Sequence, residues 1–135
     1  MTASGKMMQL YRQHSGPTSV TTEAQGPSFA VPEEGWSDIP YLDATATLSA
    51  DGRRLFVHLL NLHPSEAMET RIRIAGNAVQ PRGDVWQVAP QDFQSRNDFG
   101  ITNVDIAHYP LEGVGADFVR SLPPHSATTL EISLK

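Results

Sequence analysis

The strongest constraint on the fold is an alternation of side chains that appears in two segments, one in the first half of the chain and one at its end. In the segment 40–48, the residues that share one face are Leu42, Ala44, Ala46 and Leu48. In the segment 122–134, the corresponding residues are Thr128, Leu130, Ile132 and Leu134. A two-residue period is typical of a strand with one dry and one solvated face. We therefore expect an all-β fold built on an antiparallel sheet.

Length and charge limit the classes of protein to which the chain can belong. Its 135 residues are 39% hydrophobic and 19% charged, which predicts one folded domain with a single core. The formal net charge of −5 gives no basic surface for nucleic acid or for an anionic membrane. The absence of cysteine excludes disulfides, thiolate metal sites and cysteine nucleophiles. No stretch has the apolar length of a signal peptide or a membrane span, so we expect a cytoplasmic protein, with secretion not excluded.

Only one segment, residues 5–15, has helical periodicity. Thr2 or Ser4 can cap its start, and Gly16-Pro17 ends it. Its apolar stripe consists of Met7, Met8, Leu10 and Tyr11. Because this stripe has no obvious partner within a β-sandwich, we expect it to be an interface with another domain or a second copy of the chain.

The rest of the chain predicts about eight strands separated by turns. The expected ranges are 18–24, 41–49, 53–62, 67–75, 84–88, 101–108, 116–121 and 128–134. Asp51-Gly52 predicts the tight turn of the clearest hairpin. The proline-rich segment 25–40 and the segment 76–83 are predicted to be loops. Eight short strands are typical of a β-sandwich, here of jelly-roll type.

No motif in the sequence points to catalysis, to a metal or to a cofactor. Glu66 and Glu69 are near each other in the sequence, but they are expected beside a turn and on an exposed strand face. They are therefore poor candidates for a catalytic carboxylate pair. His58 and His63 are five residues apart across a strand end, which is a poor spacing for joint ligation of a metal, and His58 is better interpreted as a hydrogen-bonded core residue. A nucleophile elbow and a glycine-rich phosphate loop are both absent. We therefore expect no cofactor and no metal.

Aromatic residues are the better candidates for a binding function, since sugar rings pack on flat aromatic faces. The candidate sugar-binding residues are Trp36, Tyr41 and Tyr109, with Trp36 in its loop the first choice. Trp86 lies between Val85 and Val88 and is interpreted mainly as a core residue.

Several short motifs resemble the C-terminal domain of the α-L-arabinofuranosidases of glycoside hydrolase family 51. They are Leu10-Tyr-Arg-Gln-His-Ser-Gly16, Ile39-Pro-Tyr-Leu-Asp-Ala-Thr-Ala-Thr, Leu55-Phe-Val-His-Leu-Leu-Asn61, Asn97-Asp-Phe-Gly100 with Asn103-Val-Asp-Ile106, and Leu122-Pro-Pro-His-Ser-Ala-Thr-Thr-Leu. They are spread over nearly the whole chain and occur in the family's order. One departure is Leu62, which follows Asn61 where the family often has arginine.

The resemblance implies that residues 1–17 are the end of a barrel-type helix or a linker, and that residues 18–135 are the β-sandwich. It implies a parent enzyme whose (β/α)8 barrel carries two catalytic glutamates, one of them after an asparagine. This chain has no Asn-Glu dipeptide and is too short for a barrel of about 250 residues. We therefore expect a noncatalytic accessory domain that supports the barrel and an oligomer. The alternatives are an independent carbohydrate-binding module with weak glycan affinity, and a small hydrolase that would need a close carboxylate pair in a cleft.

Overall fold

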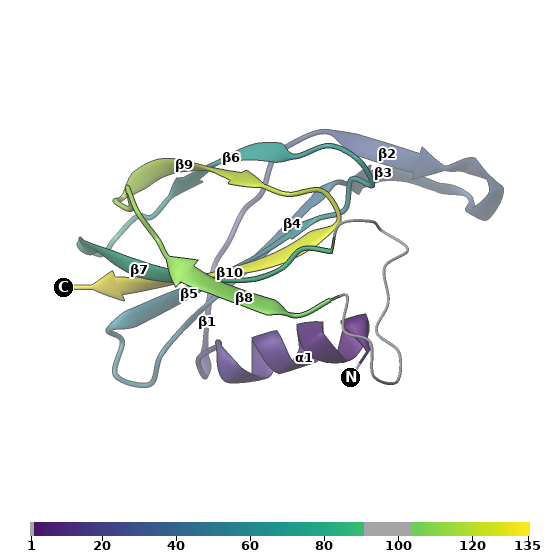
Figure 1. The fold of residues 1–135 in the computed structure, drawn as a ribbon. Helices are drawn as coiled ribbons and strands as arrows, with labels where there is room; N and C mark the ends of the chain where they lie inside the picture. The colour runs from purple at the N-terminus through teal and green to yellow at the C-terminus, as the bar shows by residue number, and fades with distance from the viewer. Residues whose placement is uncertain (1, 91–103) are drawn as a thin grey trace.

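The computed structural model describes residues 2–90 and 104–135, which form one helix, one 3₁₀ turn and ten strands (Figure 1). The helical elements are α1 (Ala3–Gln13) and η1 (Pro32–Glu34). The strands are β1 (Thr18–Val20), β2 (Ser28–Val31), β3 (Trp36–Pro40), β4 (Leu42–Leu48), β5 (Arg54–Asn61), β6 (Met68–Arg73), β7 (Val79–Val88), β8 (Ile106–Pro110), β9 (Asp117–Leu122) and β10 (Ser126–Leu134). In this part of the chain, no helix is both long and apolar enough to span a membrane.

The strands form one large sheet and two separate pairs. The large sheet has six strands in the order β1-β4-β5-β10-β7-β8, and every neighbouring pair is antiparallel. The C-terminal strand β10 lies in its interior, where Leu130 is opposite Val57 on one side and Val85 on the other. The smaller pairs are β6–β9 and the hairpin β2–β3. The expected antiparallel, mostly β fold is thus confirmed.

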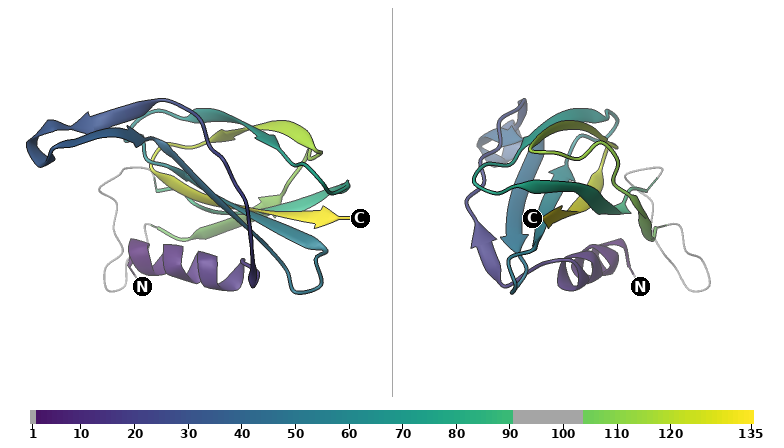
Figure 2. Two further views of the ribbon diagram at one scale, coloured as in Figure 1. Left: turned by 180° about the vertical axis from the view of Figure 1, so that it is seen from behind. Right: turned by 90° about the vertical axis from the view of Figure 1, so that its left-hand side faces the viewer.

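Three layers are visible in the structure. The β6–β9 pair lies over one face of the large sheet, and α1 lies against the other face (Figures 1 and 2). Each face has its own apolar cluster, because alternate residues of a strand point to opposite sides. In β5, for example, Leu55, Val57 and Leu59 belong to the cluster under β6–β9, and Leu60 packs against the cluster under α1. The large sheet is therefore sandwiched between a strand pair and a helix.

Helix α1 packs on its own sheet, so the expectation that its apolar stripe lacks a partner within the sandwich is wrong. Leu10 is 0% exposed and forms a cluster with Val88, Val104 and Ala127. Met7 and Tyr11 pack against the same cluster. Of the four stripe residues, Met8 alone points away from the sheet, with 73% of its surface exposed. The periodicity of the helix could not show that Leu10 packs with Ala127 and Val88 of the sheet.

Two expected loops contain strands instead. The segment 25–40 holds the β2–β3 hairpin, which projects from the body of the domain (Figure 1). Its prolines stand in the 3₁₀ turn or at strand ends, where a missing N–H is tolerated. Strand β7 starts at Val79, within the expected loop 76–83. There Gly83 lets β10 approach closely, because a Cβ atom at this position would lie 2.6 Å from the Glu131 carbonyl oxygen. The expected strand 18–24 is shorter than predicted and ends at Val20.

A buried asparagine holds the corner where β5 ends. The Asn61 side chain is 1% exposed, and its Nδ2 donates to the carbonyl oxygens of Glu66 and Pro123, both at 3.0 Å. Its Oδ1 accepts from the His63 N–H at 3.0 Å. Leu62, which departs from the family pattern, contributes only its backbone N–H, which donates to the Tyr41 carbonyl at 2.7 Å. The polar role at this corner therefore belongs to Asn61.

A stack of three rings connects α1 to the sheet. The indole of Trp86 lies between the imidazoles of His14 and His108, with centroid distances of 3.8 and 3.7 Å. His108 Nε2 is 2.8 Å from Asp84 Oδ1. Nearby, His58 is buried as expected, and its Nδ1 is 2.9 Å from Thr129 Oγ1.

The environment of this cluster changes the pKa of two imidazoles. Burial lowers the pKa of His14, His108 lowers it further, and the carboxylates of Glu131 and Asp84 oppose the change. Burial also lowers the pKa of His58, with a smaller effect from His14. The folded state therefore favours the neutral form of both rings.

We expect Leu10→Ala to destabilise the domain by about 2–5 kcal/mol, the range for a fully buried leucine that leaves a cavity. Met8→Ala, on the exposed side of the same helix, is the matched control and should change stability by less than about 0.5 kcal/mol. Urea unfolding followed by circular dichroism measures both. Equal, small effects of the two substitutions would show that α1 does not pack on this sheet.

Stability should fall as the pH is lowered from 7 to 5. His14 and His58 have folded pKa values below the unfolded value of about 6.5, so their contribution is complete above that pH and is lost as the pH falls through the folded values. The carboxylates with lowered pKa values, such as Asp117, lose their contribution only below about pH 4. Urea midpoints at several pH values test this. His58→Gln should flatten the profile between pH 7 and 5; an unchanged profile would contradict the assignment.

Candidate functional site

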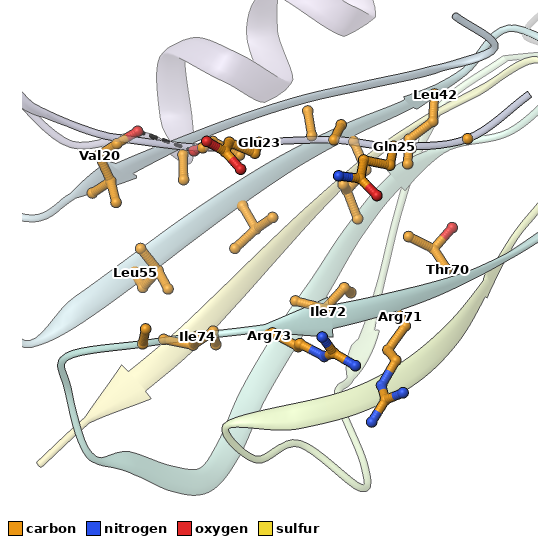
Figure 3. Close-up of a pocket in the computed structure, with 18 of the residues that line it drawn as sticks. Val20, Glu23, Gln25, Leu42, Leu55, Thr70, Arg71, Ile72, Arg73 and Ile74 are labelled. Carbon is orange, nitrogen blue, oxygen red and sulfur yellow. Dashed lines mark hydrogen bonds between the residues drawn. The ribbon is translucent and has the colours of Figure 1, made fainter. Parts of the chain in front are cut away.

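A groove of about 550 Å³ with an apolar floor lies beside β6 (Figure 3). Its floor is the inner face of two strands of the large sheet: Leu42, Ala44, Ala46 and Leu48 of β4, and Leu55, Val57 and Leu59 of β5. One wall is β6, with Met68, Ile72 and the following Ile74. The other wall is the segment 20–27.

The groove exists because the two facing sheets differ in width. The large sheet has six strands, whereas the facing sheet has two, because β6 pairs with β9 alone in the described part of the chain. The segment 21–27 crosses this region without forming a strand, and all of its residues are exposed. On the β4 side of the floor, Ala44 and Leu48 are partly exposed, whereas Leu42 and Ala46 are buried.

Charged side chains lie along the outer face of β6. Arg71 forms a two-point ion pair with Asp117 of β9, with distances of 2.8 and 2.7 Å. This hydrogen-bonded guanidinium lowers the pKa of Asp117. Arg73 Nε is farther from the same carboxylate, at 3.7 Å, and Glu69 is exposed. Apolar side chains on the floor and charges on the rim suit binding of a partly apolar ligand or segment rather than acid–base chemistry.

The structure does not bring the three candidate sugar-binding residues together. Trp36 is 58% exposed on the projecting hairpin. Tyr41 is half-buried between the rings of Phe29 and His63, at centroid distances of 4.7 and 4.8 Å. Tyr109 lies on β8, at the opposite edge of the large sheet from β1 and β4, and its hydroxyl donates to Gln87 Oε1. Of these residues, Trp36 alone presents an open ring.

Neither Trp86 nor a metal centre provides a second candidate site among the described residues. Trp86 offers no free face, because an imidazole covers each side of its ring. Within residues 2–90 and 104–135, no three histidine or acidic side chains are placed to hold a metal ion. The segment 97–103, which carries part of the family resemblance, lies outside the described residues.

Solved structures similar to this chain include arabinofuranosidases. No family model and no curated protein matches the sequence. The α-L-arabinofuranosidase of Thermotoga maritima, solved with arabinose, matches 99% of the chain with a TM-score of 0.90 and 25% identity. A structure described as an arabinofuranosidase matches 98% with a TM-score of 0.88 and 25% identity. A glycoside hydrolase family 44 endoglucanase of Clostridium thermocellum is more distant, with 22% identity and a TM-score of 0.57 over 88% of the chain.

The chain spans only a part of these enzymes. It covers 29% of the length of both arabinofuranosidases and 19% of the endoglucanase. The family 51 enzyme of Thermotoga petrophila gives the same picture, with a TM-score of 0.87 and 29% of its length covered. This chain is therefore a β-sandwich domain like that of the glycoside hydrolase family 51 arabinofuranosidases.

Proposed function

We propose that the chain is a noncatalytic accessory domain of an α-L-arabinofuranosidase-like glycoside hydrolase. Its role is to support the catalytic (β/α)8 barrel and the assembly of the parent enzyme, which removes terminal α-L-arabinofuranosyl residues. The observation that carries this proposal is the match of 98–99% of the chain to only 29% of two arabinofuranosidase structures. Nearly the whole chain is matched, but the match covers less than a third of each enzyme. The chain therefore corresponds to one domain of those enzymes.

The chemistry of the domain supports the same role. Retaining hydrolysis requires two carboxyl groups about 5–5.5 Å apart across the glycosidic bond. The floor of the groove is apolar, and the two carboxylates among its lining residues, Glu23 and Glu69, are exposed. The chain also lacks the Asn-Glu dipeptide that the resemblance associates with the acid/base residue. Catalysis is therefore assigned to the barrel.

A domain exchange tests the supporting role. In the Thermotoga maritima enzyme, the segment matched by this chain would be replaced by residues 1–135 and compared with an enzyme that lacks the segment. We expect the chimaera to be soluble and to hydrolyse an aryl α-L-arabinofuranoside, because the sandwich restores the support of the barrel. The truncated enzyme should aggregate or lose most of its activity. The isolated chain should show none.

Two controls make the exchange decisive. A chimaera carrying Leu10→Ala should be less heat-stable than the parent chimaera, since Leu10 is the buried residue under α1. A chimaera carrying Met8→Ala reports whether the one exposed stripe residue contacts the barrel. A truncated enzyme as active and as stable as the intact one would refute the supporting role, and hydrolysis by the isolated chain would refute the noncatalytic assignment.

The exposed Trp36 favours a second function, binding of arabinose-containing polysaccharide. A single open ring is a weak platform, because the two tyrosines are engaged elsewhere. We therefore expect equal mobility of the chain in native gels with arabinan, with arabinoxylan and without glycan. Retardation in one glycan that is lost in Trp36→Ala, but kept in the similarly exposed Val119→Ala, would make the domain a carbohydrate-binding module.

A further inference from the structure

Three of the five histidines of the chain lie where α1 packs on the large sheet. His14 caps the end of α1, His58 belongs to β5 and His108 belongs to β8. Tyr11 of α1 contacts the His58 ring edge-on at 4.9 Å, and the other two imidazoles cover the two faces of Trp86. Histidine is the side chain that ordinarily changes charge between pH 5 and 8. The buried residues of the cluster under β6–β9, by contrast, are all apolar.

His58 is the most deeply buried of these three imidazoles, with 6% of its surface exposed. Its Nδ1 is 2.9 Å from Thr129 Oγ1, and Tyr11 packs against its ring. A positive charge on His58 would therefore be removed from solvent and would have a hydroxyl rather than a carboxylate beside it. Because burial disfavours the charged form, protonation of His58 favours a state in which Tyr11 has moved away and solvent reaches the ring.

The two imidazoles that cover Trp86 differ in their surroundings. His108 is half-exposed, and its Nε2 is 2.8 Å from Asp84 Oδ1, so a carboxylate can balance its charge. A further charge on His14 would place two cations on opposite faces of one indole. Burial lowers the pKa of His14, and His108 lowers it further, although Glu131 and Asp84 oppose this change. Protonation of His14 therefore also favours its separation from Trp86.

The other charged groups at this interface do not change their charge between pH 7 and 5. Lys6, near the start of α1, is 2.8 Å from Asp105, and this hydrogen bond lowers the pKa of the Asp105 carboxyl. Arg54 of β5 forms an ion pair at 3.0 Å with the carboxylate of β10 that faces the end of α1. Tyr11 has a raised pKa, because of burial and then of Asp43 on β4, and so stays neutral. Acid in this range therefore acts on the imidazoles.

The segment that follows α1 is fixed to the sheet. The Gly16 N–H donates to Thr47 Oγ1 at 2.9 Å. A Cβ atom at Gly16 would lie 1.8 Å from the Leu48 carbonyl oxygen, so the backbone is seated directly on β4. From Thr18 the chain pairs with β4 as strand β1. This anchor does not involve the histidines, so the helix can leave the sheet while the chain after it stays in place.

We propose that acid, between pH 7 and 5, releases α1 from the large sheet as a unit through protonation of His14 and His58, while the six strands stay folded. The helix pivots at residues 15–17. Its release exposes Leu10 and Tyr11 and removes one of the two rings that cover Trp86. The inference concerns the chain by itself and is independent of the accessory role.

Native-state hydrogen exchange in low urea separates this release from unfolding of the whole domain, because a local opening exposes little surface and depends weakly on urea. In the released state, both imidazoles regain an ordinary pKa of about 6.5, so each proton favours that state by up to about tenfold per pH unit below this value. The α1 amides include that of His14, which donates to the Leu10 carbonyl. After correction for intrinsic rates, we expect them to exchange at least about tenfold faster at pH 5 than at pH 7, with weak urea dependence. The β10 amides, such as that of Leu130, should stay at least about 100-fold better protected at pH 5 and show the full urea dependence.

Acrylamide quenching of Trp86 fluorescence, in a Trp36→Phe background, gives a second readout. We expect the quenching constant to rise about twofold or more between pH 7 and 5 as the indole becomes accessible. His14→Phe keeps a flat ring on the indole without a titrating group, and together with His58→Gln it should abolish the rise. His125→Asn is the matched control, because it removes a histidine outside the interface whose φ of 41° suits asparagine. This control should respond to pH like the background protein.

Three results would overturn the proposal. The first is equal protection and equal urea dependence of the α1 and β10 amides at pH 5, which would show that acid unfolds the domain as a whole. The second is an unchanged quenching constant of Trp86 between pH 7 and 5. The third is a pH response that persists when His14→Phe and His58→Gln are combined. The exchange experiment uses the unchanged chain, so it remains decisive if a variant fails to fold.

Discussion

The structure depends on a C-terminal strand that is buried on both faces and paired on both edges. Strand β10 pairs with β5 through eight residues and with β7 along its other edge, and most of its side chains are buried. Leu130 and Ile132 enter the cluster under β6–β9, while Ala127 enters the cluster under α1. A sheet with such a centre needs cover on both sides. Helix α1 supplies it on one face, and β6–β9 supplies only part of it on the other.

That partial cover leaves a groove along one side of the large sheet. The floor of the groove, formed by β4 and β5, lies beside β6, which pairs with β9 alone in the described part of the chain. An unpaired strand edge can pair with other chains, so isolated domains usually keep such edges short or covered.

The fold could be predicted from the sequence where the local pattern of residues agrees with their burial in the folded domain. Alternation identified β4 and β10, and Asp51-Gly52 marked the hairpin of β4 and β5, where Gly52 has a φ of 70°. His58 was correctly interpreted as a core residue. The failures came where proline and glycine were interpreted as breakers. The β2–β3 hairpin tolerates Pro32 in its 3₁₀ turn and Pro40 at the end of β3, and β7 needs Gly83 because β10 passes so close to it.

The site was harder to predict because periodicity shows which residues share a face but not what covers that face. The stripe on α1 was interpreted as an open surface, yet Leu10 is fully buried by β7 and β10. The alternating face of β4 was interpreted as ordinary core, yet it forms the floor of the groove. Cover depends on which strands pair across long sequence separations, such as Thr70 with Arg120, and single-sequence patterns carry no such information. The sequence pattern therefore predicted the burial of Leu42 and Ala46 correctly, but it could not show that Ala44 and Leu48 of the same face stay partly exposed in the groove.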